Sequence, residues 1–241
     1  MAQPRQRSNS SDSIARLHCE MIACSRCPRL VEWREQVADE KVRRFAGEEY
    51  WGKPVPSFGD PRARLLVVGL APAAHGGNRT GRIFTGDRSG DWLYRALHRA
   101  GFANQPTSVN RGDGLKLRDC YVTAVIHCAP PLNKPLGDEI ANCRPFLIRE
   151  TRLLTELRVV VALGRLAFDA TIGLFGLATA SEPRETRLRK PNFAHGAEAG
   201  LRDGITLIAS FHPSQQNTFT GRLTEPMLDQ VFERAREIVT G

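Results

Sequence analysis

The residues best suited to chemistry begin with one long loop, GLAPAAHGGNRTGRIFTGD, which spans 69–87 and follows the apolar stretch RLLVV, 64–68. The loop combines five glycines with one aromatic residue, Phe84, and ends on a carboxylate, Asp87. Glycine lets a backbone approach a ligand closely, so the loop predicts a pocket for a flat ligand, with Phe84 as a stacking surface. The alternative is a plain connection from strand to helix, with Phe84 in the core and Asp87 as a helix N-cap.

Three known loop chemistries do not fit this loop. Gly76 and Gly77 are not followed by the Lys-Ser or Lys-Thr of a phosphate-binding loop, and the dinucleotide-binding pattern GxGxxG is absent. Ser89 stands one residue too late for the GxSxG turn that presents a hydrolase nucleophile. The lysine and the acidic metal ligands of phosphoryl-transfer enzymes are also missing, which disfavours a nucleotide-cleaving or phosphoester-cleaving enzyme.

Four of the six cysteines have a spacing that suits a metal or a cluster. Two form a CxxC pair and two more are separated by fourteen residues: Cys24, Cys27, Cys128 and Cys143. Thiolates at such spacing bind Zn²⁺ or an iron–sulfur cluster equally well. Cys19 and Cys120 have no partner at a useful spacing, and Cys120 is expected in the core.

Two further stretches carry unusual polar residues. HCAPPLNKP contains Asn133 and follows an apolar run at 120–126, whereas HPSQQNTFTGRLT contains His212 and follows a run at 205–211. A third apolar run, at 158–163, has no such sequel. We expect these runs to be buried parallel strands, because sites in parallel sheets gather at the carboxyl ends of the strands.

The elements that must position these residues alternate along the chain. Besides the four strands at 64–70, 120–126, 158–163 and 205–211, helical patterns cover 14–45, 91–99, 138–157, 165–175 and 223–239. Ser89 or Asp87 could cap the second of these helices. Alternating strands and helices predict an α/β fold whose parallel sheet has helices on both faces.

Composition bounds the partners and the location. The 241 residues suffice for one domain, 14–241, preceded by a polar tail, 1–13, that we expect to be disordered. The tail has no apolar segment of the secretory type, and no run approaches the roughly 18–20 residues that span a bilayer. We therefore expect a cytoplasmic protein with no membrane contact. With 34 Lys and Arg against 26 Asp and Glu, a nucleic acid is the commonest candidate partner.

Together, the loop 69–87, the four spaced cysteines and HPSQQNTFTGRLT resemble the family 5 (B-type) uracil-DNA glycosylases of the uracil-DNA glycosylase superfamily. The resemblance extends from Cys24 to the final helix. It implies a three-layer α/β/α fold with a central four-stranded parallel sheet. It also implies a [4Fe–4S] cluster on the four cysteines and excision of damaged bases from DNA, and we expect such an enzyme to be a monomer.

The resemblance gives each catalytic candidate a role, because an enzyme that acts on a base must flip it into a pocket. Phe84 would stack on the base, and His212 would face the base oxygen that gains charge as the bond breaks. Asp87 would orient the attacking water and stabilise the sugar cation, and Asn133 would help to hold the water or the DNA. Backbone amides would approach the base or sugar from Ala73, Ala74 and Gly76.

One substitution within the superfamily bears on specificity. The related family 4 enzymes have GEAPG where this chain has GLAPA, and they carry an Asn on the second strand that hydrogen-bonds the edge of uracil. The matching position here is Ala124, which cannot make that pair. A site that does not demand this edge rejects other bases weakly. We therefore expect broad specificity that includes uracil, hypoxanthine, xanthine and ethenocytosine.

The segment after the HPS motif is expected to enter the DNA minor groove. Leu223 or Phe219 could wedge into the gap left by the flipped base, while Asn217 and Arg222 contact the DNA. The basic stretch RETRLRK, 184–190, is either a further phosphate contact or a solvated loop. A competing interpretation is a non-catalytic nucleic-acid-binding module with a structural metal site on the four cysteines, which leaves the pocket residues unexplained.

Overall fold

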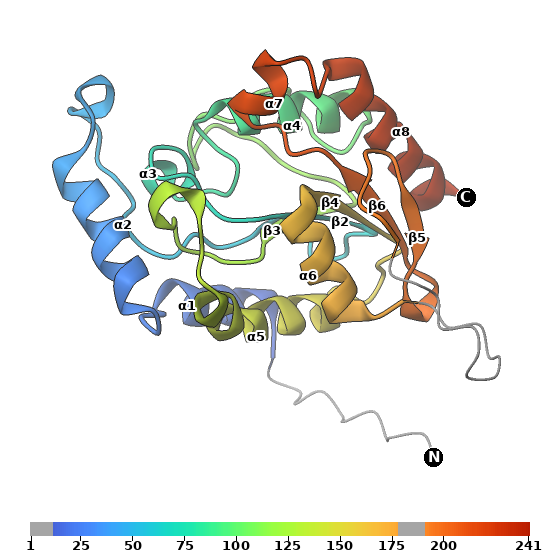
Figure 1. Cartoon of the computed structure of the whole chain (residues 1–241), viewed down its shortest axis with the longest axis horizontal. Helices are drawn as coiled ribbons and strands as arrows, with labels where there is room; N and C mark the ends of the chain where they lie inside the picture. Colours follow the sequence, from blue (N-terminus) through green and yellow to red (C-terminus); the bar gives the residue numbers. More distant parts are fainter. Residues whose placement is uncertain (1–11, 178–190) are drawn as a thin grey trace.

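A computed structural model of the chain describes residues 12–177 and 191–241, which form one sheet flanked by helices (Figure 1). The strands are β1 (Phe58–Gly59), β2 (Leu65–Gly69), β3 (Cys120–Ala124), β4 (Val159–Leu163), β5 (Glu198–Gly200) and β6 (Thr206–Ser210). The helices are α1 (Ile14–Ile22), α2 (Pro28–Glu40), α3 (Gly77–Thr80), α4 (Arg88–Arg99), α5 (Gly137–Leu153), α6 (Arg165–Phe175), α7 (Gln215–Phe219) and α8 (Glu225–Thr240). Three short 3-10 turns complete the described elements: η1 (Arg43–Phe45), η2 (Pro131–Asn133) and η3 (Arg202–Gly204).

The sheet has the order β1-β3-β2-β4-β6-β5. Its four central strands are parallel, as expected, and are those predicted from the apolar runs. The short strands β1 and β5 pair antiparallel with the two edges and were not expected from the sequence. The predicted α/β class and central four-stranded parallel sheet are confirmed, with one extra strand at each edge.

Helices cover both faces of the sheet, which gives three layers (Figure 1). Helices α4 and α8 pack together on one face, whereas α6 packs against β2 and β4 on the other. Alternate residues of β2 enter two different cores: Leu65 lies with α4 and α8, and Leu66 lies with α6. Because both faces are buried, the strand is apolar along its whole length, which is why the sequence showed a continuous run.

The single helix expected over 14–45 is two helices. Cys27 precedes α2 as its N-cap and Pro28 begins it, so the CSRC stretch forms the corner between α1 and α2. Proline suits the first position of a helix, which explains where the break falls. The last two residues of the predicted tail 1–13 belong to the fold, because Ser13 caps α1 and Asp12 forms an ion pair with Arg149.

No helix among the described residues is long and apolar enough to cross a membrane. The tail residues 1–11 and the basic stretch 184–190 lie outside the described part of the chain.

Candidate active site

A pocket of about 550 Å³ opens where the long loop, η2 and the segment after β6 meet. This volume lies within the ordinary range for small-ligand sites, roughly 300–1,000 Å³. The pocket is lined by Leu70, Ala71, Ala73, Phe84, Asp87, Arg88, Ser89, Leu132, Asn133, His212, Ser214, Gln215 and Gln216. The structure thus brings together residues that three separate segments supply, including all three predicted catalytic residues.

Asp87 is the N-cap of α4, as one of the alternatives proposed. Its Oδ1 accepts a hydrogen bond of 3.0 Å from the backbone nitrogen of Gly90. The second oxygen, Oδ2, faces Gly76, where an added Cβ would lie only 2.1 Å from it. Burial raises the pKa of Asp87, although backbone hydrogen bonds from Gly90 and Ser89 oppose the shift. The hydrogen bond at Oδ1 therefore orients the carboxylate, and the Asp87 side chain also lines the pocket.

Phe84 lies at the pocket wall with only 6% of its surface exposed. Its backbone has φ of +50°, a left-handed conformation that is uncommon for an aromatic residue. The ring covers Gly69 at the end of β2, since a Cβ on that glycine would lie 2.6 Å from two ring carbons. Its centroid is 6.0 Å from the His212 ring, with 32° between the planes. A flat ligand in the pocket can meet both rings.

His212 follows β6 and is fixed through its backbone. The side-chain amide of Asn217 donates a 2.8 Å hydrogen bond to its carbonyl oxygen. Gly164 lies behind it, where an added Cβ would meet the His212 Cβ at 3.3 Å. Burial lowers the pKa of His212 to about 4, so the imidazole is neutral near pH 7. A neutral imidazole donates a hydrogen bond without bringing a positive charge.

Asn133 comes from η2, at the rim of the pocket. It and the preceding Leu132 both have left-handed backbones, with φ of +55° and +53°. Both side chains are exposed, and the Asn133 backbone nitrogen donates to the Pro130 carbonyl at 3.1 Å. The amide of Asn133 is thus presented to the pocket by a tight turn rather than by a helix or strand.

The small residues predicted around the base fall in different places. Ala73 lines the pocket, and its carbonyl accepts a backbone hydrogen bond of 3.2 Å from Gly76. Gly76 lies behind Asp87, and Ala74 is half-buried beside it; neither is among the lining residues. Ala124 is fully buried at the end of β3, opposite Gly69, in the same core cluster as Phe84. It is not among the lining residues of the pocket.

The residues predicted to touch DNA separate into core and surface. Leu223 is fully buried, so in this conformation it packs the core and does not project as a wedge. Phe219 is 68% exposed, with the guanidinium of Arg88 4.4 Å from its ring centre. Arg222 is exposed over the ring of Phe211. Asn217, predicted to bind DNA, uses its side-chain amide to hydrogen-bond the His212 carbonyl.

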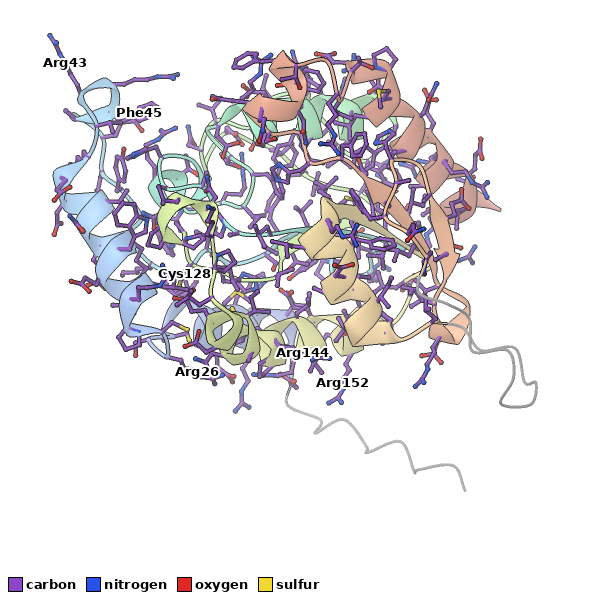
Figure 2. All side chains as sticks on the ribbon, viewed as in Figure 1. Arg26, Arg43, Phe45, Cys128, Arg144 and Arg152 are labelled. Atoms are coloured by element: carbon purple, nitrogen blue, oxygen red, sulfur yellow. The ribbon has the colours of Figure 1, made fainter. Side chains whose placement is uncertain are left out.

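The four spaced cysteines, distant in sequence, line one small pocket. The set is Cys24, Cys27, Cys128 and Cys143, and the other walls come from the α1–α2 corner, α2, the segment after β3 and α5. Arg34 donates a 3.2 Å hydrogen bond to the Cys128 sulfur, and Asn142 donates one of 3.6 Å to the Cys27 sulfur. Figure 2 shows Cys128 where the two N-terminal helices meet the segment leading to α5. Cys120 is fully buried in β3, which confirms its predicted place in the core.

The described part of the chain shows no ready-made metal site. Among residues 12–177 and 191–241, no group of three or more His, Cys, Asp or Glu side chains is arranged to hold one metal ion. Four thiols around a common space, with N–H donors directed at two sulfurs, fit a polynuclear cluster, in which each cysteine binds a different iron. Burial raises the pKa of the Cys143 thiol to about 12.

Sequence reasoning missed Arg88, Leu132, Gln215 and Gln216 as lining residues. Arg88 directly follows Asp87, and its guanidinium donates a 3.1 Å hydrogen bond to Thr218 of α7. Its position next to Asp87 in the sequence could have indicated that Arg88 lines the pocket. The other three lie in segments whose motifs were identified, but their exposure follows only from the turns.

Comparison with known proteins agrees with this geometry. Residues 56–236 match the family model of the uracil DNA glycosylase superfamily. The chain is 50% identical over 232 residues to a type-5 uracil-DNA glycosylase of Mycobacterium leprae, covering 96% of this chain and 98% of the relative. It is 50% identical over 218 residues to a type-5 enzyme of Thermus thermophilus, covering 90% and 94%. A type-4 uracil-DNA glycosylase of Pyrobaculum aerophilum is 33% identical over 204 residues, with 83% of each chain covered. The chain therefore belongs to the uracil-DNA glycosylase superfamily and, within it, groups with the type-5 uracil-DNA glycosylases.

Proposed function

We propose that this protein is a monofunctional DNA glycosylase that excises uracil and other deaminated bases from damaged DNA by base flipping. The observation that carries the proposal is the single pocket lined by Phe84, Asp87, Asn133 and His212. Such a pocket offers a stacking face, a carboxylate, an amide and a hydrogen-bond donor to one extruded nucleotide. The family membership supports the same reaction, because the type-5 and type-4 relatives are named uracil-DNA glycosylases.

In the proposed mechanism, the electron pair of the bond between the sugar C1′ and the base nitrogen leaves with the base. The neutral His212 donates a hydrogen bond to the base oxygen where negative charge develops. The ionised Asp87 stabilises the cationic sugar, and with the Asn133 amide it orients a water molecule toward C1′. The water oxygen bonds to C1′, its proton passes to the Asp87 carboxylate, and the base leaves as an anion that solvent protonates.

The substrate range follows from the character of the pocket. Ala124 carries only a methyl group, lies in the same buried cluster as Phe84, and offers no hydrogen bond to the edge of a base. We propose that hypoxanthine is excised as well as uracil, and that xanthine and ethenocytosine are also substrates. Excision of uracil with hypoxanthine left untouched would contradict this inference.

We propose that the four cysteines hold a [4Fe–4S] cluster. The convergence of the four thiols on one space supports this, as do the N–H donors of Arg34 and Asn142 at two sulfurs. When bound, the cluster would supply a covalent junction between the α1–α2 corner, the segment after β3 and helix α5. Arg34 and Asn142 would stabilise the ligand sulfurs and orient Cys128 and Cys27.

The decisive experiment measures base release from duplexes that contain one uracil, one hypoxanthine or no lesion. We expect release of both lesions by the native protein, and a loss of about 100-fold or more for Asp87→Ala. Asp91→Asn is the matched control, because Asp91 is an exposed acid in the first turn of the same helix. If protein that contains the cluster released no base from any substrate, the proposed glycosylase activity would be refuted and a DNA-binding module would be favoured.

A further inference from the structure

The inference concerns Leu132 and rests on the proposed function. We propose that Leu132 is the wedge that enters the base stack of duplex DNA when the target nucleotide flips into the pocket. Among the described residues it is the most exposed large hydrophobic side chain, with 82% of its surface accessible. It also lines the pocket itself, beside Asn133. An apolar side chain at the mouth of a base-binding pocket lies where the stack loses its nucleotide.

The backbone that presents Leu132 is strained. Its φ and ψ are +53° and +22°, and Asn133 follows at φ +55°, so two consecutive non-glycine residues are left-handed. Residues that are not glycine avoid this conformation, and it persists where the surroundings impose it and where function uses it. The conformation turns Leu132 outward and keeps Asn133 at the pocket. A relaxed turn would not present both side chains to the same substrate.

The same turn is held rigidly from behind. Pro130 and Pro131 precede it, and the Lys134 carbonyl accepts a 3.2 Å hydrogen bond from Arg29 of α2. Arg29 in turn forms a 2.7 Å ion pair with the buried Glu139 of α5. A wedge must keep its place while bases unstack around it, so a fixed turn is better suited than a flexible loop.

The two wedges expected from the sequence are less suitable. Leu223 is fully buried in the core, so its use would require unpacking. Phe219 is exposed, but Arg88 packs over its ring and is itself held by Thr218. That pairing suits a contact with the DNA backbone, with Arg88 near a phosphate. Leu132 has no such cover and lies at the end of a rigid turn.

The test separates flipping from chemistry. A duplex carries 2-aminopurine beside a 2′-fluorinated deoxyuridine, whose glycosidic bond resists cleavage, and the rise in 2-aminopurine fluorescence on binding reports flipping. Single-turnover release of uracil is measured in parallel on duplex and on single-stranded DNA. The variants are Leu132→Ala, Phe219→Ala and, as an exposed apolar control away from the pocket, Val109→Ala.

For Leu132→Ala we expect duplex excision to fall about tenfold more than single-stranded excision, and the fluorescence rise to be lost. Leu132→Phe should keep both signals, and Val109→Ala should match the native protein. Unchanged duplex excision in Leu132→Ala, equal losses on both substrates, or a larger loss in Phe219→Ala would overturn the proposal. If the native protein flips the base without releasing it, the proposed glycosylase function fails, and the wedge is still judged by fluorescence. If it neither flips nor releases, both are overturned.

Discussion

Replacing Gly76 by Ala should damage catalysis through Asp87 without touching the substrate. An added Cβ would lie 2.1 Å from Oδ2 of Asp87, 2.9 Å from its Cγ and 3.1 Å from its Cβ. An ordinary contact begins at 3.4 Å, so the carboxylate oxygen must move by about 1.3 Å. A displacement of about 1 Å in a catalytic group can cost about 100-fold in rate. The same movement strains the N-cap bond to Gly90, which is worth about 1 kcal/mol of stability.

The assay is single-turnover release of uracil from a saturating excess of enzyme, together with the midpoint of urea unfolding. We expect Gly76→Ala to lose about 100-fold in rate, and binding to uncleavable DNA to stay within about twofold. Gly173→Ala is the matched control, because it adds the same methyl group in α6 where no atom lies within 4 Å.

A double-mutant cycle identifies the cause. If Gly76 acts through Asp87, then Gly76→Ala combined with Asp87→Asn should be no slower than Asp87→Asn alone. Additive losses would refute this reasoning, because they would mean that Gly76 contributes a separate interaction, such as its own contact with the substrate. Full activity of Gly76→Ala would refute it as well, by showing that Asp87 tolerates the displacement.

Three further predictions concern pH and the cysteine pocket. Burial raises the pKa of Asp87, so the excision rate should rise with pH as this carboxyl ionises. Burial lowers the pKa of His212 to about 4, so this imidazole stays neutral above pH 5 and should add no further change in rate. A fall in rate between pH 6 and 8 would contradict this. Glu150 is fully buried, and its pKa is raised from 4.5 to about 7, so its folded form retains a proton that the unfolded chain loses. Its stabilising contribution is therefore complete below pH 4.5 and is lost as pH rises toward 7, by about 3 kcal/mol, and Glu150→Gln should abolish this part of the pH dependence of unfolding. Replacement of Arg34 by Met removes the donor to the Cys128 sulfur, so the iron–sulfur absorbance should bleach several-fold faster in air; an unchanged bleaching rate would exclude a role for this bond.

The central strands were predictable because burial on both faces leaves a plain signal. The apolar runs at 64–70, 120–126, 158–163 and 205–211 each contain an observed parallel strand, shortened by one or two residues. The edge strands were not predictable, because β1 and β5 are two and three residues long and half-buried or exposed. Their pairing depends on the strands beside them, which a local pattern does not describe.

The candidate catalytic residues were predictable by type, but their supports were not. Asp87 was singled out at the end of the long glycine-rich loop and His212 after the fourth apolar run, and both line the pocket; their catalytic roles stay predictions. Leu223, by contrast, was expected to project as a wedge because it lies in the segment after the HPS motif. The structure buries it instead, and its backbone nitrogen donates to the Asn217 carbonyl at 3.0 Å. That contact joins the segment before α8 to α7, a five-residue helix that the pattern of polar and apolar residues does not reveal.

The pocket owes its geometry to backbone constraints behind each functional side chain. Asp87 is fixed by its cap on α4 and by Gly76, Phe84 by its left-handed backbone and Gly69, and His212 by a bond to its carbonyl. Burial meanwhile disfavours charge on both titrating groups, so the pocket suits a neutral base. In the proposed mechanism, ionised Asp87 would be the charge beside the sugar, where a cation must be stabilised as the glycosidic bond breaks.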